Sequence, residues 1–167
     1  MIEKILENKF PFPNIKEIEN ELEKGSIKIG NLILSKANLK AIIPRGEILK
    51  DGENVFYDFY ALLGIKEFLI KENSKWKIPN AEDFMSLERH LENNISLIRL
   101  LNKHDKMQYS IWWSDPEFYY NEYMNCIYVM RINFYENRVF HPERVPTLKS
   151  FNIRLVKEVE NEKSFNT

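Results

Sequence analysis

The stretch that most constrains the fold is residues 76–91, WKIPNAEDFMSLERHL, which predicts a short strand followed by a well-marked helix. Pro79 stops regular structure, and Asn80 is a preferred N-cap because its side-chain oxygen can accept from a free amide of the first turn. Glu82 and Asp83 place negative charge at the positive end of the helix dipole. The apolar positions recur at helical spacing: Phe84, Leu87 and Leu91. The unit therefore predicts a scaffold helix with one buried face.

Before this unit, short helical and extended patterns alternate. Asn14 is a good N-cap for a first helix, and Gly30-Asn31 can turn a hairpin. An aromatic helical face is expected to end at Gly64. The predicted elements are a helix at 14–24, a strand or hairpin at 26–34, an extended piece at 38–43, a polar loop at 45–54 and a helix at 55–63.

After residue 107 the chain is rich in aromatic and β-branched residues, which favour strands. A turn at Glu136-Asn137 would follow the longest of them. Helical turns are expected at 95–101, and strands at 107–113, 123–135, 138–140 and 151–159. With helices mostly before strands, the fold class is α+β with an antiparallel sheet. We expect a helical extension at 1–25, a main domain at 26–160 and a loose tail at 161–167.

Composition excludes several classes of protein. The net charge is −1, which removes the electrostatic case for generic nucleic-acid binding. Cys126 is the single cysteine, so neither an intrachain disulfide nor a cysteine-rich zinc site is expected. The start, MIEKILENKF, is broken by charges, and no stretch is apolar enough to span a membrane. We therefore expect a cytoplasmic protein.

Several blocks of the chain resemble, in order, those of the Fibrobacter succinogenes major paralogous domain, a DUF1566-like family. The blocks are IKIGNLILSKANLK (27–40), FYDFYALLG (56–64), WKIPNAEDFMSLERHL (76–91), YSIWWSDPE (109–117) and FNIRLVKE (151–158). The resemblance implies a C-type-lectin-like fold, with two helices packed on a small, twisted antiparallel sheet. The chain departs from the family at Ile33 and Leu34, where a Trp is usual, and at Leu155, where a Cys is usual.

The lectin-like fold makes calcium-dependent sugar binding the first function to test. Asp115, Glu117 and Asn121 could supply oxygens, with Glu122 nearby. Calcium needs six to eight of these, and no Glu-Pro-Asn or Gln-Pro-Asp ligand loop is present. Asp115 before Pro116 is typical of a turn residue, so no metal site is predicted. A carbohydrate- or ligand-binding domain, with or without calcium, is kept as the alternative function.

Catalytic motifs are not evident in the sequence. The oxidase chemistry of formylglycine-generating enzymes, which share the broad fold, needs paired cysteines, and Cys126 is alone. His90, His104 and His141 lie in different elements, with no metal-ligand spacing. A site around His141 and Glu143 is the weakest of the hypotheses. We expect no enzyme activity and no cofactor.

Aromatic side chains are the strongest remaining signal. Trp112 and Trp113 should point to opposite faces of a strand, so at most one is expected to be simple core. Tyr and Trp are enriched in interface hot spots. The candidate partner-binding residues are Trp112, Trp113, Tyr119, Tyr120 and Tyr123, with the basic residues Arg131, Arg138 and Arg144.

These patterns favour a non-enzymatic module that binds another protein or a ribonucleoprotein, with nucleic acid only weakly supported. Arg131 and Arg154 could share one sheet face and grip an acidic partner or an RNA backbone. One specific version is an inhibitor made by a phage or mobile element against a host defence nuclease, such as a CRISPR effector.

Overall fold

The computed structural model describes residues 2–5, 13–52, 54–92, 94–104, 110–115, 126–132, 140–146 and 149–160. These residues form helices and small antiparallel sheets, which confirms the α+β class. The finer expectation of a C-type-lectin-like fold stays a prediction, as does the division into extension, domain and tail.

Three small sheets replace the single sheet expected from the sequence. Each has three strands, and the neighbouring strands within each sheet are antiparallel. The first is β1 (Ile2–Ile5), β4 (Ile48–Asp51) and β5 (Asn54–Tyr57); the second is β2 (Ile27–Ile29), β3 (Leu32–Leu34) and β9 (Val156–Glu158); the third is β6 (Ser110–Trp113), β7 (Cys126–Ile132) and β8 (Phe140–Pro146).

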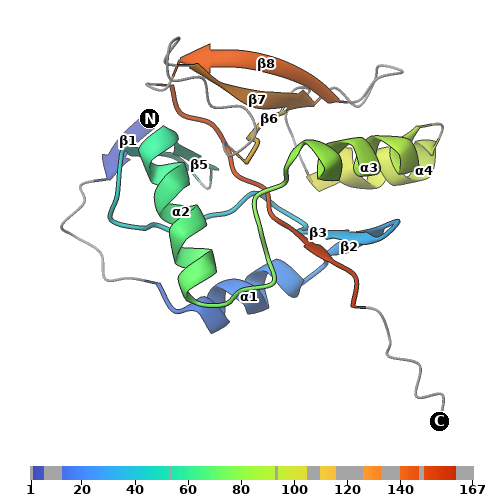
Figure 1. Cartoon of the computed structure of the whole chain (residues 1–167), viewed down its shortest axis with the longest axis horizontal. Helices are drawn as coiled ribbons and strands as arrows, with labels where there is room; N and C mark the ends of the chain where they lie inside the picture. Colours follow the sequence, from blue (N-terminus) through green and yellow to red (C-terminus); the bar gives the residue numbers. More distant parts are fainter. Residues whose placement is uncertain are drawn as a thin grey trace.

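Four helices pack around these sheets (Figure 1). They are α1 (Ile15–Glu23), α2 (Phe59–Lys71), α3 (Ala81–Leu91) and α4 (Ile95–His104). The predicted cap of α3 is confirmed, because Asn80 Oδ1 accepts from the Asp83 amide at 2.9 Å, while the Asp83 carboxylate accepts from the Asn80 amide. Asn14 likewise caps α1, accepting from the Lys16 amide at 2.9 Å.

Two predictions between residues 45 and 64 are wrong. The expected polar loop contains β4, which pairs with β5 across a turn at Gly52, where φ is +59°. The expected helix at 55–63 begins only at Phe59 and does not end at Gly64, which lies inside α2. The aliphatic part of Arg45 lies 3.1 Å from where a Cβ on Gly64 would be. Gly64 therefore serves close packing on α2 instead of a helix end.

The predicted hairpin at 26–34 is confirmed as β2 and β3, with Gly30 at φ +63° in its turn. The strand predicted at 138–140 is longer than expected, because β8 extends to Pro146 along β7. The turn predicted at Glu136-Asn137 lies outside the described residues. The extended piece predicted at 38–43 forms no strand.

The C-terminal segment 151–156 connects all three sheets. Figure 1 shows it crossing the middle of the molecule, in orange to red, between the β6–β7–β8 sheet and the β2–β3 hairpin. Its backbone bonds join Phe151 to Tyr57 of β5, Asn152 to Trp113 of β6, and Val156 to Lys77 and to β3. Residues 152–156 are all buried. The last predicted strand is thus a central connector, and only its final part is β9.

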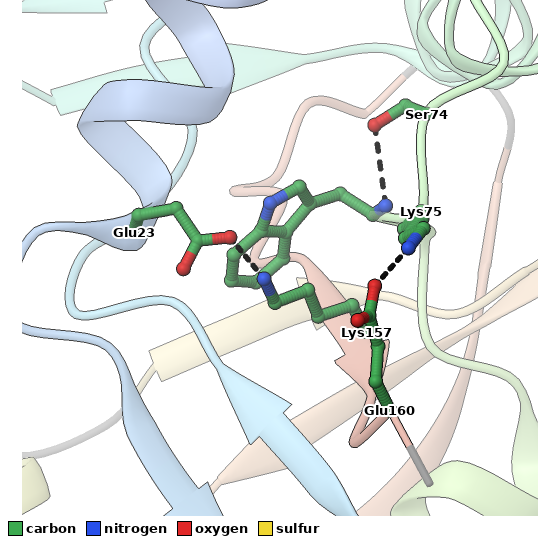
Figure 2. A network of polar contacts seen from close by, with 6 residues as sticks. Glu23, Ser74, Lys75, Lys157 and Glu160 are labelled. Carbon is green, nitrogen blue, oxygen red and sulfur yellow. Dashed lines mark hydrogen bonds and ion pairs between the residues drawn. The ribbon is translucent and has the colours of Figure 1, made fainter. Parts of the chain in front are cut away.

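A cluster of polar contacts fastens β9 to α1 and to the segment before α3 (Figure 2). The short strand predicted in that segment is present only as an isolated bridge between Lys77 and Val156. The Lys157 ammonium bonds to the Glu23 carboxylate at the end of α1 and lies 5.1 Å from the ring centroid of buried Trp76. Lys75 pairs with Glu160 beside it. These contacts hold the C-terminal end of α1 in place.

Candidate functional site: a groove beside the first helix

A groove of about 500 Å³ lies between α1 and the segment 35–41. We call it the α1 groove. Its volume falls within the range of ligand and cofactor pockets, about 300–1,000 Å³. From the α1 side it is lined by Pro13, Glu17, Ile18, Glu21, Leu22, Lys24 and Gly25, and from the other side by each residue of 35–41.

The helical wall is held by apolar burial. Leu22 is buried in the larger core cluster, and Ile15 and Ile18 pack partly buried against it. These residues follow the helical spacing seen in the sequence, which leaves Glu17 and Glu21 exposed at the rim. The Glu23–Lys157 pair fastens the end of the same helix to β9.

The opposite wall bulges away from the central connector. The Ser35 amide donates to the Leu155 carbonyl at 3.1 Å, and the Leu39 amide to the Ile153 carbonyl at 2.7 Å. Between these two hydrogen bonds the chain advances four residues from Ser35 to Leu39, but only two from Ile153 to Leu155. Residues 36–38 therefore bulge out and cannot continue a regular ladder with the connector. The extended piece predicted at 38–43 bonds to the connector through the Leu39 amide and forms no named strand.

Arg154 fills the space under the bulge. Its side chain is 1% exposed, and its guanidinium donates to the carbonyls of Ser35 at 2.9 Å and Lys36 at 2.8 Å. The same group lies 4.9 Å from the ring centroid of Trp112, within cation–π range. Because a buried charge is costly unless it is well bonded, these contacts fix the shape of the wall.

Tyr57 supports the far end of this wall. Its hydroxyl lies 2.6 Å from the Ala41 carbonyl and 3.2 Å from the Leu39 carbonyl, to which it can donate. The side chain is fully buried, and this burial raises the pKa of the phenol well above its ordinary value of 10.0. Tyr57 therefore acts as a neutral donor at ordinary pH.

Polar groups on the bulge are left without partners within the described ranges. The amides of Lys36, Ala37 and Asn38 donate to no acceptor there. Asn38 Oδ1 is shielded from solvent and also has no hydrogen-bond partner. Lys36 and Ala37 are exposed, so their amides are the groups here that a bound molecule could contact, whereas the shielded Asn38 oxygen is not.

Charges of both signs border the groove. The α1 rim carries Glu17 and Glu21, and Lys24 pairs with Glu21 at 3.0 Å. The bulge carries exposed Lys36 and Lys40. An acidic rim thus faces a basic rim across an apolar floor.

The partner-binding assignment of Trp112 and Trp113 is not supported by the structure. The two side chains do lie in different clusters, as predicted for opposite faces of a strand, but each is 0% exposed. The expectation that at most one is core is therefore wrong. Each tryptophan packs against residues outside the third sheet: Trp113 against Phe151, and Trp112 in the cluster that contains Phe84 and Leu87 of α3.

The other predicted contact residues are less well defined. Tyr119, Tyr120, Tyr123 and Arg138 lie outside the described residues. Arg131 lies in β7 opposite His141, and Arg144 lies in β8 opposite Tyr128. The suggestion that Arg154 grips a partner is wrong, because that guanidinium is buried against the protein's own carbonyls. The buried role of Arg154 could not be read from its alternation with apolar neighbours.

Residues considered for calcium and metal binding are not brought together. Asp115 accepts from Lys66 at 2.7 Å, and Glu117 and Asn121 lie outside the described ranges. Among the residues that the structure describes, no group of three His, Cys, Asp or Glu side chains could hold a metal ion. None of the described helices is long and apolar enough to cross a membrane.

Sequence reasoning missed the α1 groove. The available signal was the small, polar run SKANLKA (35–41) after a hairpin, beside a helix with an acidic face. No family model, curated protein or solved structure matches this chain.

Proposed function

We propose that this protein is a non-enzymatic, cytoplasmic binding module that engages another macromolecule through the α1 groove. The observation that carries the proposal is the bulge at 36–38, which lines a partly apolar groove and whose amides have no acceptor among the described residues. These are the groups that a partner can satisfy.

The walls are suited to binding because they are already fixed. Arg154 holds the bulge from below, and Lys157 holds the end of α1. A preorganised site loses less conformational entropy when it binds. Both walls of the groove come from the N-terminal part of the chain, between Pro13 and Ala41, and the lining bears no pair of groups arranged as nucleophile and base.

One specific form of this proposal is an inhibitor, made by a phage or mobile element, of a host defence nuclease such as a CRISPR effector. A small binding module fits that role because occlusion needs only affinity and shape. Its test is a plasmid-interference assay, in which expression of the protein should restore survival of a targeted plasmid.

The experiment that tests binding compares two tryptophan variants. Ala37→Trp places a bulky ring at an exposed groove position, and Ser96→Trp adds the same ring at an exposed position on α4. Each protein is incubated with lysate from its native host, cross-linked, and separated by size exclusion with mass spectrometry.

We expect one stoichiometric partner with the wild type and Ser96→Trp, and its loss with Ala37→Trp. If the partner still binds the Ala37→Trp variant, the binding surface lies elsewhere, and the groove is refuted as the site. Recovery of no stoichiometric partner in any sample would refute the function itself.

A further inference from the structure

We propose that the occupant of the α1 groove is an extended polypeptide segment whose main chain pairs with the bulge at 36–38. This inference rests on the proposed function and narrows it, because the partner contributes a peptide at this site and not a nucleic acid.

The first argument is the backbone of the bulge. Ser35 and Leu39 use their amides inward, on Leu155 and Ile153. Between them, the amides of three successive residues have no acceptor within the described ranges. On the inner side, the Arg154 guanidinium donates to the carbonyls of Ser35 and Lys36, so residues 36–38 cannot pair with the connector. The carbonyl of Ala37 is also used, by the Ser35 hydroxyl. The bulge therefore offers mainly donors, and the main-chain carbonyls of a bound peptide are acceptors suited to them.

The second argument is the floor. Ile18, Leu22 and Leu39 supply apolar surface between the two rims. At one end, Gly25 at φ +68° lets the Lys36 side chain cross closely, with Lys36 Cδ 2.6 Å from where a Cβ would be. A peptide lying along the groove presents alternate side chains to such a floor, while its other side chains stay in solvent.

The third argument is charge, which separates peptide from nucleic acid. Glu17 and Glu21 lie on the helical side of the groove, where Lys24 pairs with Glu21. A phosphodiester chain carries negative charge at every step, so a strand in this groove would lie against those carboxylates. A peptide with a basic side chain toward α1 and an acidic side chain toward Lys36 and Lys40 complements both rims.

The probe for this proposal is a phage-displayed library of random 12-residue peptides. The library is selected on the wild-type protein after depletion on Ala37→Trp. An enriched sequence is then synthesised with a fluorescein label and titrated by fluorescence anisotropy. We expect its affinity to fall at least tenfold in Ala37→Trp and less than twofold in Ser96→Trp.

Two further readouts test the mode of binding. Amide hydrogen exchange at residues 36–38 should slow when the peptide is bound, because the proposal pairs these amides. The double variant Glu17→Lys, Glu21→Lys should weaken a peptide that carries a basic residue, and the same peptide with that residue changed to Glu should bind this variant better than the wild type.

Failure to enrich any groove-dependent peptide would overturn the proposal, as would unchanged exchange at 36–38 in the complex. A labelled 20-nucleotide single-stranded RNA that binds the wild type and is lost from Ala37→Trp would also overturn it. In that last case the lysate partner would still depend on the groove, so the proposed function would stand while the peptide inference fell.

Discussion

Strand β6 and the α1 groove differ in two ways: in how typical their residue types are of binding surfaces, and in whether those residues are buried. The strand carries Trp112 and Trp113, two of the side chains most typical of binding surfaces, yet both are fully buried. The segment 35–41 carries small and polar side chains of little individual note, yet it lines the groove. Residue type alone therefore does not indicate which of the two regions reaches the surface.

The difference comes from the number of layers around each region. The third sheet has core on both faces, because Trp112 packs in the cluster of α3 and Trp113 in the cluster of α2 and β5. The bulge is supported on one side only, by Arg154 and the central connector. Its outer side remains open toward α1.

The largest effect should follow Trp113→Ala. This side chain is fully buried, and its indole nitrogen donates to the Tyr57 carbonyl at 2.6 Å. We expect the free energy of unfolding in urea to fall by about 3–5 kcal/mol, the usual cost of truncating a buried aromatic residue. Phenylalanine substitutions sharpen the comparison: Trp113→Phe should cost more than Trp112→Phe, whose Nε1 has no described partner. Equal costs would contradict a structural role for the Trp113 hydrogen bond.

Arg154→Met should have the next largest effect. It leaves two inward-facing carbonyls without their donor, and we expect about 2–4 kcal/mol of lost stability. Hydrogen exchange should also quicken at Ser35 and Leu39, whose amides bond to the connector. The matched control is Lys75→Met, which removes an exposed cation paired with Glu160 and should cost under about 0.5 kcal/mol. Similar costs for the two variants would show that Arg154 does not hold the wall.

Tyr57→Phe should give a smaller, pH-dependent loss of about 1–2 kcal/mol at pH 8. The folded state raises the pKa of Tyr57 above 10.0, so between that value and the folded pKa only the unfolded chain loses the phenolic proton. Wild-type stability should therefore fall as pH rises above 10. The variant lacks this contribution, so its cost relative to wild type should shrink over the same range in urea titrations. A pH-independent cost would contradict burial of the phenol.

Ala37→Trp should have the smallest effect on stability, within about 0.5 kcal/mol, because the position is exposed. Its melting temperature should match that of Ser96→Trp by calorimetry. A marked loss of stability would contradict the exposed position of Ala37 in the groove. Unchanged stability makes loss of binding attributable to the groove.

Much of the local structure was predictable from the sequence. The caps at Asn14 and Asn80 and the hairpin at Gly30 rest on contacts between residues a few positions apart, so a short window contains the whole cause. The resemblance to the lectin-like family stays a prediction. The strand β4 was missed because its residues look like a loop until β5 pairs with them.

The amino-acid sequence by itself determined the starts of α1 and α3, their apolar faces and the α+β class, because caps, periodicity and turn residues act locally. Tertiary structure decided which faces meet water. Arg154 is next to Leu155 in sequence, but its guanidinium is bonded more than a hundred residues away, at Ser35 and Lys36. That long-range contact supports the bulge that lines the α1 groove. It could not be predicted from a short stretch of sequence, because the two segments meet only when the C-terminal connector crosses the fold.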